Sequence, residues 1–210
     1  MAALTAQRQA AAVRELASRD ADLAAIVDRC GAPPFWSRPQ GFATLVYIVL
    51  EQQVSLASAR ASYDRVTALL TEFSAPAFLK IEDTDLRACG FSRQKTRYTR
   101  LIAEAMVSGK LPLARLGRFS DERVRAELTA ITGVGDWTAE IYMMTALRRP
   151  DLWPLGDLAM VKAIRDVKGL AADSDRDRLH ELGESYRPYR SVAAQLYWRH
   201  YLTPKADSGR

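Results

Sequence analysis

The stretch Leu128 to Ala139, "LTAITGVGDWTA", decides how the middle of the chain folds, because two glycines interrupt a helical pattern there. Apolar residues at helix spacing precede the glycines, and Trp137 begins a second helical run after them. Gly133 and Gly135 both permit a positive φ and leave the backbone bare. The pattern therefore predicts two helices joined by a tight hairpin.

This helix-hairpin-helix is expected at about residues 120–148. The first N–H groups of its second helix have no partner within the helix and lie at the positive end of the helix dipole. Where no bulky side chain shields them, such groups form a seat for an anion, and a nucleic-acid phosphate suits that seat. A plain turn, in which the glycines only close the loop, is the alternative, and the two glycines alone favour it.

A second break, "LGDLAMVKAI" (Leu155 to Ile164), places the carboxylate of Asp157 directly behind Gly156 at a predicted helix start. Aspartate is a strong N-cap residue, because its carboxylate accepts hydrogen bonds from N–H groups of the first turn. The helix dipole favours the ionised form of a carboxylate at this place. Asp157 is either a structural cap, which is the commoner case, or a fixed negative charge for chemistry.

Apolar residues at helix spacing predict helices along nearly the whole chain, and there is no sustained strand-like alternation. Proline-rich bends at Cys30–Gly41 and Arg148–Gly156 divide it. We predict an all-α fold of two helical domains with a cleft where the chain crosses between them. Residues 1–40 and 158–210 form one domain from both chain ends, and 41–157 form the central one. Helices are expected at roughly 5–18, 20–30, 40–53, 55–72, 84–89, 92–108, 120–131, 136–148, 157–168, 174–185 and 188–202, with N-caps at Asp20, Ser55, Thr84, Ser92, Ser120 and Asp157.

The charge of the 210-residue chain is moderately basic, with a formal net charge of +5 and a pI near 9.4. The segments Ser92–Arg100 and Arg187–Ala206 each hold four bases and no acid, whereas Asp173–Glu184 holds five acids and two arginines. This distribution favours one basic face and a polyanionic partner, although scattered surface charge remains the alternative.

Cys30 and Cys89 are the only cysteines, which excludes a disulfide framework or a four-cysteine metal cluster. They favour a reducing cytoplasm. The longest apolar run, Phe42 to Leu50, is too short to cross a bilayer, and the N-terminal residues lack the apolar core of a signal peptide. We expect a cytoplasmic protein without membrane contact, associated with the nucleoid if the chain is bacterial.

Four ordered segments resemble the helix-hairpin-helix (HhH-GPD) DNA glycosylase superfamily. "LTAITGVGDWTAEIYMM" and "DLWPLGDLAMVKAI" look like its hairpin and its Gly/Pro-Asp loop, and "IVLEQQVSLASA" (Ile48 to Ala59) resembles a third family segment. "RPYRSVAAQLYW" (Arg187 to Trp198) resembles the C-terminal helix of the 3-methyladenine DNA glycosylase II branch. The resemblance implies a DNA-binding cleft, double-stranded DNA with alkylated bases as partner, a monomer and no cofactor.

Two departures indicate the branch. Bifunctional relatives such as endonuclease III carry a lysine nucleophile where this chain has Trp137, and they commonly hold an iron–sulfur cluster near the C-terminus, whereas no cysteine follows Cys89 here. The chain also has no room for the additional N-terminal β-containing domain of the larger bacterial member. The resemblance therefore implies a compact, all-helical, monofunctional enzyme of base excision repair.

Such an enzyme hydrolyses the N-glycosidic bond of alkylated, cationic purines such as 3-methyladenine and 7-methylguanine. These bases are already good leaving groups, so one carboxylate suffices where sugar hydrolases need a pair. A glycosylase for a deaminated or mismatched base, and a non-catalytic DNA-binding module, remain alternatives. The resemblance assigns catalysis to Asp157 and the base pocket to Trp137 and Trp198, with Tyr142 as a weaker candidate. Phe35 and Trp36 are interpreted as core packing.

The resemblance also implies the DNA contacts. Gln53 matches the residue that fills the gap left by the flipped base, whereas Gln52 is interpreted as structural. No metal is required, although relatives hold a monovalent cation on the hairpin carbonyls, here near Thr132 and Val134. The DNA-binding candidates are Gln53, Gly133, Val134, Gly135, Thr138, Lys95, Lys162 and Arg190.

Overall fold

The computed structural model describes residues 3–171 and 176–204, and helices are the only regular secondary structure within them. The predicted all-α fold class is confirmed. The chain divides into two compact units. The terminal unit comprises residues 1–37 and 148–210, and the central unit comprises residues 38–147.

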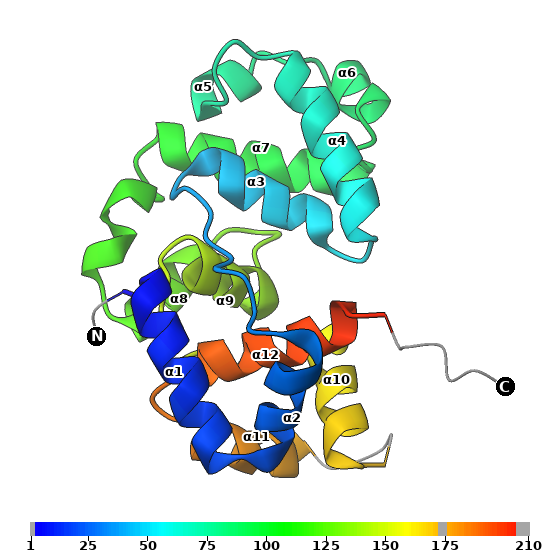
Figure 1. Ribbon diagram of the computed structural model, residues 1–210. Helices are drawn as coiled ribbons and strands as arrows, with labels where there is room; N and C mark the ends of the chain where they lie inside the picture. The colour runs from blue at the N-terminus through cyan, green and yellow to red at the C-terminus, as the bar shows by residue number, and fades with distance from the viewer. Residues whose placement is uncertain (1–2, 172–175, 205–210) are drawn as a thin grey trace, which may run out of the picture. The chain divides into compact units, whose positions relative to one another are not determined.

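The terminal unit is built around its last helix. Figure 1 shows α12 beside α1, α2 and α10, and these contacts bring both ends of the chain into one core. Residues at helix spacing fill this core, among them the fully buried Leu16, Leu23, Ile164 and Leu196. Its helices are α1 (Ala6–Arg19), α2 (Ala21–Cys30), α10 (Leu158–Lys168), α11 (Arg176–Ser185) and α12 (Arg190–Leu202).

A buried polar network at Asp20 joins three parts of this unit. Asp20 separates α1 from α2 and caps α2, accepting bonds from the N–H groups of Asp22 and Leu23. Lys168 Nζ, at the end of α10, donates to its two carboxylate oxygens at 2.8 and 2.6 Å, and the Tyr186 hydroxyl donates at 2.7 Å. Burial acts to raise the pKa of Asp20, but the bonds from Lys168 and Tyr186 outweigh it and leave that pKa lowered.

The central unit is built around the predicted apolar run. This run forms α3, which packs on α4, α7 and α9 (Figure 1). Aromatic contacts support it, including Phe42 with Phe78 at a centroid distance of 5.4 Å. The helices are α3 (Phe42–Glu51), α4 (Leu56–Ala68), α5 (Ala75–Phe78), α6 (Asp83–Ala88), α7 (Arg93–Val107), the 3-10 helix η1 (Leu113–Arg118), α8 (Asp121–Thr129) and α9 (Asp136–Thr145).

The structure differs from the sequence expectations in local details. The short α5 and η1 were not predicted, because neither is long enough to show an amphipathic period. Thr84 was expected as an N-cap, but α6 begins one residue earlier, with Glu82 at the N-cap. The start expected for the helix 174–185 lies in part outside the described residues.

The boundaries of the two units also lie elsewhere than expected. Residues 38–40 belong to the central unit, and residues 148–157 belong to the terminal unit. The reason for the second shift is bonding with the chain end. The Leu152 N–H donates to Ser191 Oγ at 2.9 Å, and Trp153 Nε1 donates to the Leu179 carbonyl at 2.9 Å. Asp157 therefore belongs to the terminal unit.

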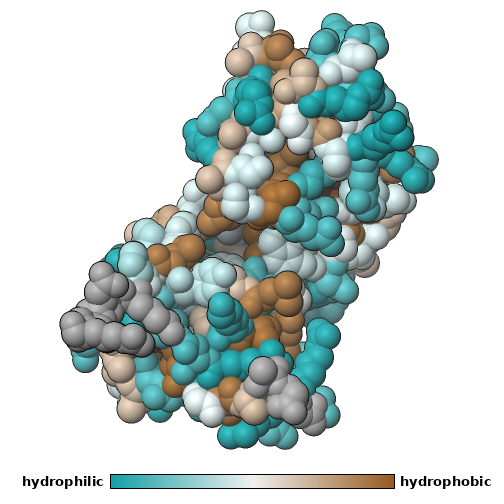
Figure 2. Space-filling view, turned by 90° about the vertical axis from the view of Figure 1, so that its right-hand side faces the viewer, coloured by the Kyte–Doolittle hydropathy of each residue, from teal (hydrophilic) through white to brown (hydrophobic). Residues whose placement is uncertain are grey.

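The surface is largely polar. On the face shown in Figure 2, hydrophilic side chains predominate and hydrophobic ones form separate patches. Among the described helices, none combines the length and the apolar character that crossing a membrane requires.

Candidate functional site

The hairpin between α8 and α9 is a tightly packed turn. Gly133 has a φ of 96°, and a Cβ added there would lie 2.1 Å from Tyr98 Cγ. Both its backbone angle and its neighbour on α7 therefore demand glycine. Val134 is buried, and its N–H donates to the Ile131 carbonyl at 3.0 Å. The side chain of Val134 is thus part of the core, while the turn itself is fixed against α7.

Gln52 ties this hairpin to the end of α3. Its Nε2 donates to the Gly133 carbonyl at 3.0 Å and to Thr138 Oγ1 at 2.8 Å. This is the structural role expected for Gln52. It also corrects the expectation for Thr138, whose side chain is buried and whose hydroxyl already serves this internal bond. Its position inside the hairpin does not offer that side chain to DNA.

Gly135 differs from Gly133 in its backbone angle and in the space around its Cα. Its φ is −85°, an ordinary value, so Gly135 does not use the positive φ that glycine permits. An added Cβ would meet no heavy atom within 4 Å. Gly135 is the N-cap of α9, and no side chain at this cap bonds to the first-turn N–H groups. Intramolecular packing therefore gives no reason for glycine at this position.

Asp157 is the N-cap of α10 and is half-buried. Its Oδ1 accepts a hydrogen bond from the Met160 N–H at 2.8 Å and another from Trp198 Nε1 at 3.2 Å. One bond comes from its own helix and the other from α12. The carboxylate is therefore oriented by two elements that lie far apart in the sequence.

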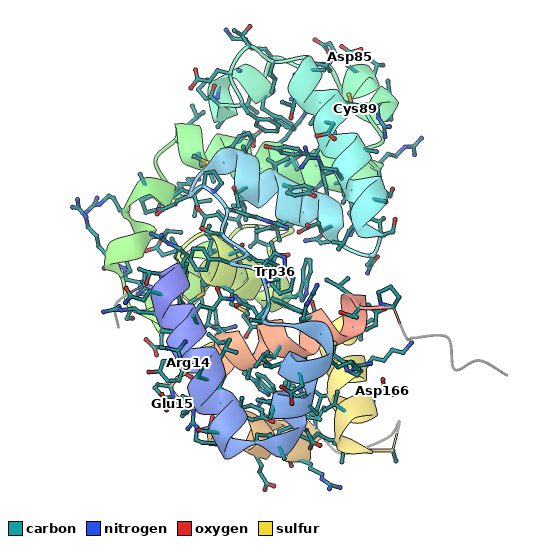
Figure 3. The ribbon with its side chains drawn as sticks, viewed as in Figure 1. Arg14, Glu15, Trp36, Asp85, Cys89 and Asp166 are labelled. Atoms are coloured by element: carbon teal, nitrogen blue, oxygen red, sulfur yellow. The ribbon has the colours of Figure 1, made fainter. Side chains whose placement is uncertain are left out.

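Trp198 belongs to an aromatic pair. The ring of Trp36, which Figure 3 labels on the connection after α2, lies edge-on to it at a centroid distance of 6.2 Å. Both side chains are partly exposed. Trp36 is therefore not part of the buried core, which corrects its interpretation as core packing. Its contact with Trp198 depends on how the bend after α2 folds against α12.

Three predicted contacts serve the protein's own structure, and these predictions are corrected. Tyr142 is fully buried, its hydroxyl accepts the Gly41 N–H at 3.1 Å, and burial raises its pKa. Lys95 Nζ donates to the Leu50 carbonyl at 2.7 Å, and burial lowers its pKa.

Arg190 is the third of these residues. It bonds to the carboxylate of Asp151 at 2.9 Å and to that of Glu184 at 2.9 Å. Asp151 is buried, and its Oδ2 also forms an ion pair with Arg187 Nη1 at 3.2 Å. The acids neutralise these two arginines, so this part of the predicted C-terminal basic segment is a structural ion-pair network.

Gln53, Lys162 and Trp137 remain accessible. Gln53 is exposed in the turn between α3 and α4, and its φ of 55° is unusual for a residue other than glycine. Val54 beside it is 43% exposed. Lys162 is exposed on α10, with Nζ 5.9 Å from the centroid of the Tyr201 ring, and Trp137 is half-buried in the first turn of α9.

Within residues 3–171 and 176–204, no group of three or more His, Cys, Asp or Glu side chains is arranged to hold a metal ion. The hairpin carbonyls near Thr132 and Val134 form a different kind of candidate site, since they offer backbone oxygens only. Of the carbonyls in this turn, that of Gly133 already accepts the bond from Gln52.

Comparison with known proteins identifies the family. Residues 46–188 match the model of the HhH-GPD superfamily of base excision DNA repair proteins, which is more than half of the chain. The chain belongs to that superfamily. It is 30% identical over 166 residues to DNA-3-methyladenine glycosylase 1 of Schizosaccharomyces pombe, covering 77% of this chain and 73% of the relative.

Two further likenesses extend over most of the chain. The alkylbase DNA glycosidase-like protein mag2 of S. pombe is 25% identical over 195 residues, 90% of this chain and 92% of that protein. The solved structure of S. pombe 3-methyladenine DNA glycosylase in complex with abasic DNA superimposes with a TM-score of 0.83 at 28% identity. The superposition covers 89% of this chain and 94% of that one.

Proposed function

We propose that this member of the HhH-GPD superfamily is a monofunctional DNA glycosylase that releases alkylated, cationic purines such as 3-methyladenine and 7-methylguanine. The observation that carries the proposal is the carboxylate of Asp157, oriented by Met160 and by Trp198 beside a pair of tryptophan rings. The proposed partner is double-stranded DNA, on which the chain acts as a monomer in the cytoplasm.

Asp157 supplies the negative charge that the reaction needs. An alkylated purine carries positive charge, and its glycosidic bond breaks towards an oxocarbenium ion without a strong general acid. A fixed carboxylate beside the sugar stabilises this developing cation and orients the attacking water. Because two N–H donors already hold Oδ1, the carboxylate requires little reorganisation during the reaction.

The aromatic side chains supply selectivity by charge. A cationic purine beside an electron-rich ring gains roughly 0.5–2 kcal/mol, whereas a neutral purine gains stacking only. Trp198 and Trp36 provide such rings next to Asp157. Trp137 remains a proposed base-pocket residue on the sequence resemblance alone. Because the base must leave the helical stack to reach a pocket, cationic damaged bases with weakened pairing are favoured further.

DNA is held mainly through its backbone. The start of α9 at Gly135 binds one phosphate, because the glycine N-cap has no side chain to shield the backbone there. Lys162, which is exposed on α10, binds a second phosphate. Gln53 projects from its exposed turn into the gap that the flipped base leaves, where its amide bonds the unpaired partner base.

The reaction is hydrolysis without strand cleavage. A lyase needs an amine nucleophile that forms a Schiff base, and the indole of Trp137 at the corresponding position has none. A glycosylase for another lesion would share the Asp157 geometry but not the preference for cationic purines.

Release of bases from methylated duplex DNA tests this function. We expect free 3-methyladenine and 7-methylguanine, intact strands, and no covalent adduct after borohydride treatment. Release of uracil or mismatched bases in place of the methylated purines would indicate another lesion. Binding without any base release would indicate a non-catalytic module, and a borohydride-stable adduct would overturn the assignment to hydrolysis alone.

A further inference from the structure

Arginine side chains gather at a pocket between α6 and α7 in the central unit. The pocket has a volume of about 440 Å3, and Arg87, Arg93, Arg97 and Arg100 line it together with Asp83 and Glu104. Helix α6 can be found in Figure 3 by the labels of Asp85 and Cys89, and it packs on α7. None of these arginines belongs to the functional sites described above.

Three of the four arginines come from one face of α7. Arg93, Arg97 and Arg100 follow one another at spacings of four and three residues, which places them on the same side of a helix. Arg87 joins them from α6. Arg87, Arg93 and Arg97 are exposed, so their guanidinium groups are accessible to a ligand from solution.

The acids at the pocket do not cancel this charge. Asp83 pairs with Arg100 at 2.6 Å, and Arg100 also donates to the carbonyl of Ile81 at 2.5 Å. Arg100 is therefore a fixed wall of the pocket. Three arginines then face only the single exposed carboxylate of Glu104, which leaves an excess of positive charge.

The lining also contains an unsatisfied donor. Thr96 is 4% exposed, and its Oγ1 has no hydrogen-bond partner. Buried hydroxyl groups are nearly always bonded, so this Oγ1 beneath the arginines is an exception. The guanidinium groups that line the pocket are donors that suit phosphate oxygens.

The same helix connects this pocket to the hairpin. Tyr98, the residue after Arg97, lies against Gly133 from another side of α7.

We propose that the α6–α7 arginine pocket is a further backbone-phosphate site for the DNA, outside the damaged nucleotide. The inference rests on the proposed function, since its ligand is the DNA on which the enzyme acts. The pocket adds affinity and fixes the direction of the strand, but it does not take part in base release. An acidic protein segment would also suit the charge, but the helix that carries three of the arginines also packs on the hairpin proposed to hold a phosphate, which favours DNA.

The test is a double variant, Arg87→Ala with Arg97→Ala, measured by DNA binding across a salt series on a duplex of roughly 20 base pairs, about two helical turns. We expect affinity to fall about tenfold or more, equally for damaged and undamaged DNA, because phosphate contacts carry no lesion information. The slope of log affinity against log salt should shrink by about 0.9 for each lost contact. Base release at saturating enzyme should be unchanged.

Two controls separate a specific site from a general loss of charge. Arg115→Ala removes an exposed base from η1, which follows the carboxyl end of α7, and it should leave affinity nearly unchanged. Arg87→Lys with Arg97→Lys keeps both charges and should retain most of the salt slope. Thermal unfolding should be nearly unchanged in all three, because the substituted side chains are exposed.

The inference is overturned if the double alanine variant binds DNA like the wild type, or if Arg115→Ala weakens binding as much. Polyglutamate serves as a probe for an acidic protein segment. The inference is also overturned if the double alanine variant loses binding of polyglutamate but not of DNA, because the pocket would then be assigned to an acidic protein. Failure of the proposed function is distinct: a wild-type protein that binds DNA but releases no base leaves this binding test valid. A wild type that does not bind DNA overturns both.

Discussion

The N-termini of α9 and α10 differ in the residue at the N-cap. Both present first-turn N–H groups at the positive end of a helix dipole. At α10 the side chain of Asp157 accepts one of these bonds, whereas at α9 the cap is Gly135, which has no side chain to do so. The first start carries its own negative charge, whereas the second has no cap side chain.

Under the proposed function, this difference lets one fold bind a ligand with charges of both signs. The DNA backbone is anionic and suits the uncapped start of α9. The alkylated base and the sugar in the transition state are cationic and suit the carboxylate at the start of α10. The same backbone geometry therefore gives opposite electrostatics, and a single residue type at the N-cap decides which.

Asp157→Asn should have the largest effect, on catalysis alone. Asparagine caps a helix as well as aspartate does, and its Oδ1 accepts the same bonds from Met160 and Trp198. The fold should be preserved while the negative charge is lost. We expect single-turnover release of 7-methylguanine to fall about a thousandfold, roughly 4 kcal/mol, with little change in DNA affinity. Release close to the wild-type rate would contradict the assignment.

Gly133→Ala should have the next largest effect, on stability. The added Cβ would lie 2.1 Å from Tyr98 Cγ, and the φ of 96° disfavours any side chain. Strain and overpacking together should lower the free energy of unfolding by about 2–4 kcal/mol. Denaturant unfolding measures it. Gly135→Ala is the matched control, because its Cβ meets no heavy atom within 4 Å and its φ is ordinary.

Gly135→Asp converts the start of α9 into a copy of the start of α10. The new carboxylate can cap the helix, so the free energy of unfolding should stay the same or rise by about 0.5 kcal/mol. A charge that occupies the anion seat should lower the affinity for damaged and undamaged duplex alike, by about tenfold or more. Gly135→Ser separates capping from charge. If Gly135→Asp binds DNA like the wild type, the hairpin is only a turn.

Asp20 offers a third helix start, where an aspartate cap serves stability. Its pKa is lowered in the folded protein, so its contribution is fully present above the ordinary pKa near 3.9 and is lost as the pH falls through the folded value. At neutral pH, Asp20→Asn should cost about 1–2 kcal/mol and leave base release intact. The difference from the wild type should shrink as the solution is acidified below about pH 4. A difference that does not change with pH would contradict this account.

Trp198→Phe should have the smallest effect. It removes the donor to Asp157 Oδ1 while keeping an aromatic ring, and Met160 still holds the carboxylate. We expect release of 7-methylguanine to fall about five- to tenfold, in line with roughly 1 kcal/mol for one hydrogen bond. Single-turnover kinetics measure it. Trp36→Phe is the control, because its ring contacts Trp198; an equal loss would indicate ring packing as the cause.

The sequence was sufficient where the signal is local. Amphipathic spacing and side-chain caps located the longer helices, and the N-caps Asp20, Ser55, Ser92, Ser120 and Asp157 are those observed. The two glycines, the apolar run and the four motif segments were enough to indicate the all-α fold and the family. These features depend on residues that are close in the sequence, because the hydrogen bonds of a helix join residues only four positions apart.

Only the tertiary structure decided which side chains are accessible. Tyr142, Lys95 and Arg190 have the chemistry of binding residues, but Gly41, Leu50 and Asp151 already bond to them. Trp36 lies beside Trp198, 162 positions away in the sequence, and Gly133 needs to be glycine because of Tyr98 on another helix. Composition and spacing determine what a side chain can bind, whereas packing between distant segments determines whether it is already bound.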